Sequence, residues 1–341
     1  MKTLLYIGLD FHRKTKSSEF ILDLLGERYS VLRCDVDPTG EDPYSLLKAM
    51  DGRSFDVVLC FQVMPPRELL DRYITYSHGV LVPMYDGCPK VAKTEKWYPY
   101  RDFQIICFCC VLAENLIKSG FSAKAIQYYP VPAVRPIWGN ATSVFFWYRR
   151  KRININLVDK ICGRLGVDHI HLHNAPDPGQ PRFDPPENSA IRYTESVWFE
   201  TRDELLRVIE ESALYIAPRP LEGIGMSFLE AMAMGKCIIA PNSPTMNEYI
   251  IHGYNGLLYD MDDPQPLPSF EIRRIQENAY QSIMEGHRQW IGKRTSILDW
   301  IEEAPVSISR RVAFFMARRF FRNPVKVGRV LKSEQRRRRN G

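Results

Sequence analysis

Short apolar runs alternate with amphipathic segments along the first third of the chain. The apolar runs predict strands at residues 3–9, 29–34, 57–61, 79–84 and 104–110, with a closing strand at 126–132. Helices are expected between them, one running from Ser17 or Ser18 as candidate caps through Glu27, and another at 113–120. Because strands that are separated by helices form parallel sheets, the pattern predicts an α/β domain.

The alternation breaks once and then resumes. The break is made by proline and glycine residues: Pro130, Pro132, Pro136 and Gly139. A new strand is expected at 143–148, so we predict a hinge near residues 133–141. The length of 341 residues fits two α/β domains, which we place at 1–135 and 141–300. With 45% hydrophobic residues, such a chain can bury a substantial core.

A glycine turn between a strand and a helix is the most informative local feature. An apolar run at 213–218 predicts the strand, and Gly223 and Gly225 follow in the turn. The helix begins near Met226, so its unpaired N–H groups and the positive end of its dipole point at the turn. A diphosphate fits such a place, and Glu230 lies one turn further along the same helical face, where ribose hydroxyls would be natural partners.

This segment resembles the retaining nucleotide-sugar glycosyltransferases of the GT-B fold. Glu222 and Glu230 match their Glu-x7-Glu motif, and residues 236–248 and 252–258 resemble the strand and loop that follow it. The resemblance implies two Rossmann-like domains that face each other across a cleft, with the nucleotide in the second. The residues alone also fit a simple turn and a buried amphipathic helix with Glu222 in solvent.

The resemblance assigns roles around this turn. Glu230 would accept hydrogen bonds from the ribose of the donor. Glu222 would address the transferred sugar and is our first candidate catalytic residue. The backbone amides of the turn would position the sugar and its phosphates, and we list them as donor-binding: Gly223, Ile224, Gly225 and Met226.

Cations for the diphosphate are expected from the loop after the first strand of the second domain. That loop holds Arg149, Arg150, Lys151 and Arg152, without the spacing usual in the family, so the choice among them stays open. Arginine is favoured over lysine because its guanidinium binds phosphate with two hydrogen bonds. These residues also fit a solvated basic turn. Such cations would stabilise the leaving diphosphate without a metal or a cofactor.

The acceptor side is expected in the first domain. Family members often carry a histidine near the end of a strand where this chain has Tyr85 and Asp86. Asp86 is therefore our candidate acceptor contact and second catalytic candidate, and an Asx turn at Asp86 and Gly87 is the alternative. The basic loop 12–16 would face the same cleft, where it could meet an acceptor phosphate, or it is a plain exposed loop.

Histidines and cysteines offer weaker signals. His169, His171 and His173 alternate along an apparent strand, but no further ligand completes a metal set. We expect a strand edge that faces solvent or the cleft, and we include His173 among the donor-binding candidates. The loop that follows, 174–187, is too rich in proline for regular structure. The eight cysteines are scattered among apolar runs, which predicts buried, reduced thiols.

The charge is distributed unevenly. The tail from 304 to 341 holds 12 Lys or Arg against one acid, a net +11, whereas the other residues hold 34 basic and 39 acidic groups, a net −5. Aromatic residues interleave with cations at 312–322, a segment that fits either membrane attachment or a helix crossing back onto the first domain. We expect the tail to attach to an anionic membrane surface. The start of the chain fits a first strand better than a signal peptide, and no apolar run could span a bilayer, so a cytoplasmic location is expected, either free or at the inner face of the membrane.

The combined expectation is a metal-independent, retaining glycosyltransferase of the hexosyltransferase type. It would move a sugar from a nucleotide-diphosphate donor to a glycan or lipid-linked acceptor, in the synthesis of surface polysaccharide. One alternative is a non-catalytic GT-B-like subunit that binds a glycan or a partner enzyme. Nucleic-acid binding by the arginine run 336–339 is a weaker alternative, because no nucleic-acid motif accompanies it.

Overall fold

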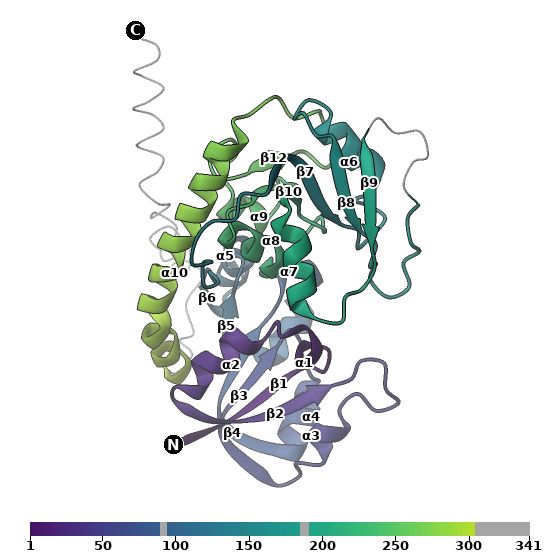
Figure 1. Cartoon of the computed structure of the whole chain (residues 1–341). Coiled ribbons are helices and arrows are strands. Elements are labelled where there is room, and N and C mark those ends of the chain that lie inside the picture. The colour runs from purple at the N-terminus through teal and green to yellow at the C-terminus, as the bar shows by residue number, and fades with distance from the viewer. Residues whose placement is uncertain (89–93, 185–190, 304–341) are drawn as a thin grey trace.

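The computed structural model describes residues 1–88, 94–184 and 191–303 of the chain. Within these ranges the chain forms two α/β domains, each built on a six-stranded parallel sheet. Figure 1 shows the two domains stacked one above the other, with a long final helix along one side of both. The expected fold class, two Rossmann-like domains of an α/β protein, is confirmed.

The N-terminal domain contains the first sheet, in the order β2-β1-β3-β4-β5-β6. Its strands are β1 (Lys2–Leu9), β2 (Tyr29–Val36), β3 (Arg53–Phe61), β4 (Ile74–Val82), β5 (Gln104–Cys107) and β6 (Ser122–Ala125). Its helices and 3-10 turns are α1 (His12–Thr15), α2 (Glu19–Gly26), α3 (Ser45–Lys48), α4 (Arg67–Tyr73), η1 (Tyr85–Gly87), η2 (Thr94–Tyr100) and α5 (Cys110–Lys118). Leu4, Leu5, Tyr6 and Ile7 are all fully buried, as expected for a central parallel strand covered on both faces.

The C-terminal domain contains the second sheet, in the order β12-β11-β10-β7-β8-β9. Its strands are β7 (Asn140–Trp147), β8 (His169–His173), β9 (Arg192–Ser196), β10 (Ser212–Ile216), β11 (Cys237–Pro241) and β12 (Leu257–Tyr259). Its helices are α6 (Ile155–Cys162), α7 (Arg202–Glu210), α8 (Met226–Ala233), α9 (Met246–Tyr249) and α10 (Ile272–Glu302).

Each sheet has one point at which the strand order reverses, and such points are where open α/β sheets bind ligands. In the first sheet β1 lies between β2 and β3, so the loops after β1 and β3 lie side by side. In the second sheet β7 lies between β8 and β10, so the loops after these three strands converge. The first group carries His12 and Gln62, and the second carries Arg149 and Arg219.

Helix α10 connects the two domains. Its first turns belong to the C-terminal domain, where Gln276 Nε2 donates to the carbonyl oxygens of Trp138 at 2.7 Å and Ala213 at 3.4 Å. Further along, the Trp290 ring packs 6.0 Å from that of Phe20 on α2. At its end Glu302 pairs with Lys2 at 2.6 Å. The second half of the helix therefore packs on the N-terminal domain, as Figure 1 shows.

Two strand predictions need correction. The closing strand lies at β6, and residues 126–132 form no strand. Their polar groups bond to the other domain instead, since the Tyr128 N–H donates to Tyr249 Oη at 3.1 Å and Gln127 Nε2 donates to the Glu248 carbonyl at 3.0 Å. The strand predicted at 104–110 ends at Cys107, because Cys110 already begins α5. Its N–H donates to the Glu248 carboxylate at 2.7 Å.

The described residues show the state of the cysteines and the length of the apolar helices. All eight cysteines are free, and Cys34, Cys60, Cys107, Cys109, Cys162 and Cys237 are buried. None of the helices in the described ranges is both long and apolar enough to pass through a membrane. The basic tail from 304 to 341 lies outside the described residues, so its proposed roles stay predictions.

Close packing of α10 on the segment between the domains makes Gly286 sensitive to substitution. A Cβ atom at Gly286 would lie 2.2 Å from the Tyr129 ring, whereas a Cβ at Gly292 on the same helix meets nothing within 4 Å. We expect Gly286→Ala to lower the free energy of unfolding by about 1–3 kcal/mol through overpacking. Gly292→Ala should raise it by up to about 1 kcal/mol because alanine favours the helix. Urea unfolding of both variants tests this, and a Gly286→Ala protein as stable as Gly292→Ala would contradict it.

Candidate active site

The turn between β10 and α8 depends on its two glycines. Gly225 has φ +81, and a Cβ atom there would lie 1.9 Å from the Phe228 ring. A Cβ at Gly223 would lie 2.8 Å from the Met84 side chain, which belongs to the N-terminal domain. Ile224 between them is buried. The turn thus brings the start of α8, at Met226 as predicted, close to the other domain.

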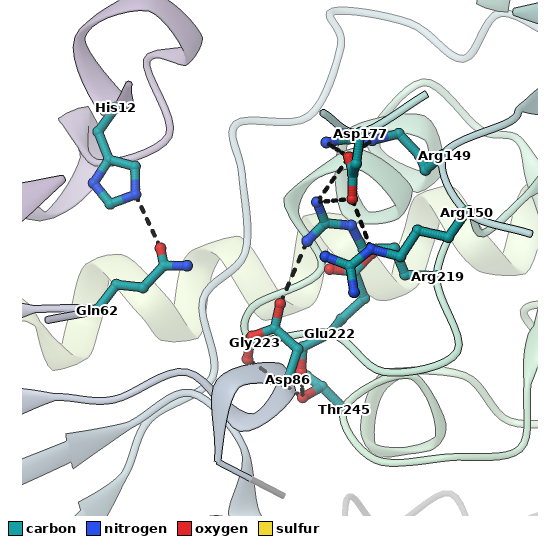
Figure 2. Close-up of polar contacts among 10 residues, drawn as sticks. All are labelled: His12, Gln62, Asp86, Arg149, Arg150, Asp177, Arg219, Glu222, Gly223 and Thr245. Atoms are coloured by element: carbon teal, nitrogen blue, oxygen red, sulfur yellow. Dashed lines mark hydrogen bonds and ion pairs between the residues drawn. The ribbon is translucent and has the colours of Figure 1, made fainter. Parts of the chain in front are cut away.

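Three guanidinium groups surround the Asp177 carboxylate at the end of the second sheet (Figure 2). Arg149 Nε donates to Asp177 Oδ1 at 2.6 Å, and Arg150 Nε donates to Oδ2 at 2.7 Å. Arg219 Nη2 donates to the same two oxygens at 3.3 and 3.1 Å. Burial alone would raise the pKa of Asp177, but Arg149, Arg150 and Arg219 together bring it below its ordinary value. Asp177 is therefore an ion-paired carboxylate.

Arg219 also reaches the other domain. Its Nη1 donates to Asp86 Oδ2 at 3.4 Å, which joins the 3-10 turn η1 of the N-terminal domain to the arginine cluster. The Asp86 Oδ1 atom is buried and has no hydrogen-bond partner among the described residues. Burial raises the pKa of Asp86, and Arg219 offsets part of this effect. Asp86 thus lies where the two domains meet, and its role as an acceptor contact stays a prediction.

Glu222 is buried beside this cluster. Its backbone carbonyl accepts a hydrogen bond from Thr245 Oγ1 at 2.8 Å, which fixes the turn. Burial raises the pKa of Glu222 to about 7, against the opposing effect of Arg219. A carboxyl with a pKa near neutrality changes its protonation at the pH of the cell. Glu222 can therefore either accept a hydrogen bond or donate one to a bound hydroxyl.

Glu230 lies further along α8, apart from the arginine cluster. Its Oε1 accepts a hydrogen bond from Arg202 Nη2, at the start of α7, at 2.8 Å. Burial raises the pKa of Glu230, and Arg202 opposes this shift. The two glutamates of the motif therefore have different neighbours: Glu222 lies near Arg219, and Glu230 bonds to Arg202.

The basic loop after β7 divides into two parts. Arg149 and Arg150 join the cluster, and burial lowers the pKa of Arg149, with Arg219 adding to this effect. Arg152 points elsewhere, since its Nη2 lies 3.6 Å from Asp262 Oδ1 and its side chain is 61% exposed. The structure therefore brings Arg149 and Arg150 to the site and does not bring Arg152 there.

His173 lies at the C-terminal end of β8 in an aromatic group. Its ring stacks on Phe199 with centroids 4.9 Å apart and meets Trp147 edge-on at 5.1 Å. Its Nδ1 lies 2.9 Å from Ser196 Oγ. Burial, with smaller contributions from His171 and Arg149, lowers the pKa of His173 to about 4, so the ring is neutral at pH 7. His173 is only 1% exposed, and β8 lies between β7 and β9, so the expectation of a strand edge that faces solvent or the cleft is wrong for this histidine.

The N-terminal domain contributes His12 and Gln62 at its own strand-reversal point (Figure 2). His12 is buried, its Nε2 lies 2.9 Å from Gln62 Oε1, and its Nδ1 has no partner among the described residues. Gln62 has φ +64, a conformation that non-glycine residues rarely adopt and that often marks a functional position. Residues 12–15, expected to be part of a basic loop, form the short helix α1 instead, and Lys14 Nζ on this helix lies 5.1 Å from the Trp198 ring of the C-terminal domain.

Sequence reasoning missed Asp177, Gln62 and the role of Arg219. Arg219 is part of the informative segment, yet its partners Asp86 and Asp177 come from two other loops. Asp177 lies in the proline-rich loop after β8, which becomes a neighbour of Arg149 and Arg219 through the strand order. A signal was available for Arg219, since an arginine three residues before Glu222 follows a strand end.

The two facing domains and the turn at the start of α8 define an α/β protein with the GT-B fold, which several solved glycosyltransferases share. Residues 192–270 match the family model described as Glycosyl transferases group 1, which confirms the resemblance over that part of the chain. This range includes Arg219, Glu222 and Glu230.

Part of the chain is also similar in sequence to individual glycosyltransferases. The uncharacterized glycosyltransferase MJ1069 of Methanocaldococcus jannaschii is 31% identical over 97 residues, which are 28% of this chain and 24% of that protein. The matched part of this chain therefore spans about a quarter of the length of its curated relatives.

Solved structures extend the likeness of fold to most of the chain. The lipopolysaccharide outer core galactosyltransferase WaaB superposes with a TM-score of 0.58 at 13% identity, covering 86% of this chain and 98% of WaaB. Anabaena Alr3699/HepE, solved with UDP and glucose, superposes with a TM-score of 0.51 at 14% identity, covering 87% of this chain and 100% of that one.

Proposed function

We propose that the chain is a retaining glycosyltransferase that moves a sugar from a nucleoside-diphosphate donor to a glycan or lipid-linked acceptor. The observation that carries the proposal is the convergence of Arg149, Arg150 and Arg219 on one point beside Glu222 and the start of α8. Guanidinium groups and helix N-termini both favour phosphate. The presence of UDP and glucose in the similarly folded Alr3699/HepE supports the same class of donor.

The proposed roles follow from where the groups lie. The arginines and the first N–H groups of α8 hold the diphosphate and offset the charge that develops on it as the glycosidic bond breaks. Because these cations come from the protein, we propose that transfer needs no metal ion. Glu222 addresses the hydroxyls of the transferred sugar. Asp86, His12 and Gln62, all on the N-terminal domain, face the acceptor.

Retention follows in this proposal from attack on the face that the diphosphate leaves. The leaving phosphate oxygen then takes the proton of the acceptor hydroxyl. The C–O bond to the diphosphate breaks as the bond to the acceptor oxygen forms on the same face, so the anomeric configuration is unchanged. Surface polysaccharide synthesis at the inner face of the cell membrane is the proposed setting.

A thermal-unfolding screen of UDP-, GDP- and dTDP-sugars tests the donor class. A true donor at 100 times its dissociation constant should stabilise the chain by about 2.7 kcal/mol. Transfer should then proceed in EDTA, and NMR of the product should show the anomeric configuration of the donor. A chain that binds a glycan but neither binds nor hydrolyses any nucleotide sugar would instead be the non-catalytic subunit.

Replacing Glu230 should weaken donor binding specifically. Glu230→Ala is expected to reduce the affinity for the nucleotide by about 1.5–3 kcal/mol, the scale of hydrogen bonds to a charged group. Asp203→Ala, which removes an exposed carboxylate from the first turn of α7, is the matched control and should bind normally. Calorimetry measures both, and unchanged affinity in a folded Glu230→Ala protein would remove Glu230 from the ribose site.

A further inference from the structure

The Asp177 carboxylate occupies the centre of the arginine cluster. Its two oxygens accept hydrogen bonds from Arg149, Arg150 and Arg219, between 2.6 and 3.3 Å. Its side chain is only 9% exposed, so solvent reaches it little. A carboxylate and a phosphate make the same demands on guanidinium groups, namely negative charge and several acceptor oxygens. Asp177 therefore fills the position that the donor phosphate is proposed to take.

The charges of the cluster are already balanced without a ligand. Three guanidinium groups, from Arg149, Arg150 and Arg219, face three carboxyl groups, from Asp86, Asp177 and Glu222. When all three carboxyls are ionised the cluster has no net charge, so it has little attraction for a diphosphate. The nearest carboxylate repels such a ligand most, because the interaction falls with distance.

The position of the Asp177 side chain is not required to hold its loop. The backbone N–H of Asp177 donates to the Arg149 carbonyl at 3.0 Å, and the Asp177 carbonyl accepts from the Gln180 N–H at 3.0 Å. The loop is closed separately by Asn174, which bonds to both backbone groups of Phe183. Rotation of the carboxylate out of the cluster would therefore leave these backbone hydrogen bonds in place.

We propose that Asp177 is a placeholder anion, which occupies the phosphate position among the three arginines in the empty site and leaves it when a diphosphate binds. The inference rests on the proposed function for the identity of that diphosphate. In the empty site Asp177 keeps three like charges together, which would otherwise repel each other. After transfer its return competes with the nucleoside diphosphate for the arginines and promotes release of this product.

The test compares Asp177→Asn with Asp184→Asn, an exposed aspartate of the same loop. Calorimetry measures the dissociation constants of UDP and of inorganic pyrophosphate. Asp177→Asn should bind both anions about tenfold more tightly than the unmodified chain, since the competing charge is gone. Without added anion, Asp177→Asn should unfold at a lower temperature than the unmodified chain. Added pyrophosphate should raise its unfolding temperature by more than it raises that of the unmodified chain or of Asp184→Asn. A purely structural role would lower the unfolding temperature without this anion-specific gain.

Equal or weaker binding of both anions by a folded Asp177→Asn protein would overturn the inference, and the donor proposal would stand if the unmodified chain binds UDP. Tighter pyrophosphate binding by the variant, with no nucleotide sugar bound by either protein, would support the placeholder and remove the proposed donor. If the variant fails to fold alone, refolding in pyrophosphate decides: recovery supports the inference, and failure to recover contradicts it.

Discussion

Replacing Arg219 with methionine should lower kcat/KM for the donor by about three orders of magnitude. Arg219 contacts both Asp177 and Asp86, so its loss removes a cation from the proposed diphosphate site and an ion pair between the domains. Removing one group that stabilises developing charge typically costs a factor of about 10²–10³ in turnover. Weaker donor binding adds to this loss.

Stability should fall in the same variant. Near Arg219, Glu222 is buried and the Asp86 side chain is 22% exposed. A buried carboxylate left without its cation costs about 3–5 kcal/mol unless it takes up a proton. Arg207→Met, at an exposed position on α7, is the control and should keep normal activity. Steady-state kinetics and urea unfolding measure both effects. An Arg219→Met protein with more than a tenth of the normal kcat/KM would show that the arginine cluster does not hold the donor.

The isosteric change Glu222→Gln should make the chain more stable at neutral pH and much less active. The pKa of Glu222 is about 7 in the folded chain, whereas its ordinary value is 4.5. The folded state therefore keeps the proton to a higher pH than the unfolded state does. The contribution of Glu222 to the free energy of unfolding is therefore fully present below pH 4.5, and it is lost as the pH rises through 7. A shift of this size corresponds to about 3 kcal/mol at pH 8.

Urea unfolding between pH 4.5 and 8 measures this difference. Glu222→Gln should equal the unmodified chain near pH 4.5 and exceed it by about 3 kcal/mol at pH 8, because glutamine does not titrate. Glu211→Gln, which changes an exposed glutamate, is the control. Turnover of Glu222→Gln should fall more than its nucleotide affinity, since Glu222 is proposed to address the sugar. Full turnover would remove it from the site, and a pH-independent difference in stability would contradict the burial argument.

Local chemistry explains why some features were predictable. The turn at Gly223 and Gly225 and the helix that begins at Met226 depend on residues adjacent in sequence, so the pattern alone placed them correctly. The strand at 126–132 was predicted wrongly for the opposite reason. Its apolar residues fit a strand, but its hydrogen bonds go to Glu248 and Tyr249, more than a hundred residues away.

The arginine cluster at the site also depends on contacts between residues that are far apart in the sequence, which the sequence pattern could not predict. The sequence indicated Arg149 and Arg150 as members of a basic loop, and it could not separate them from Arg152. That separation depends on Asp177, which becomes a neighbour only because β7 lies between β8 and β10. Alternation of strands and helices predicts a parallel sheet but not its strand order. The pairing of His12 with Gln62 depends likewise on the order of the first sheet.

The pairing of Glu302 with Lys2 has a consequence for synthesis of the chain on the ribosome. The contact joins residues 300 positions apart, and Tyr29 donates a second hydrogen bond to the same carboxylate at 3.0 Å. Domains of a growing chain usually fold in order from the N-terminus. Here the first domain lacks one of its covering helices until residue 302 has been made. The surface of the first domain on which α10 packs, which includes Phe20, stays exposed while the second domain is translated. Chaperones would bind this exposed apolar surface during synthesis.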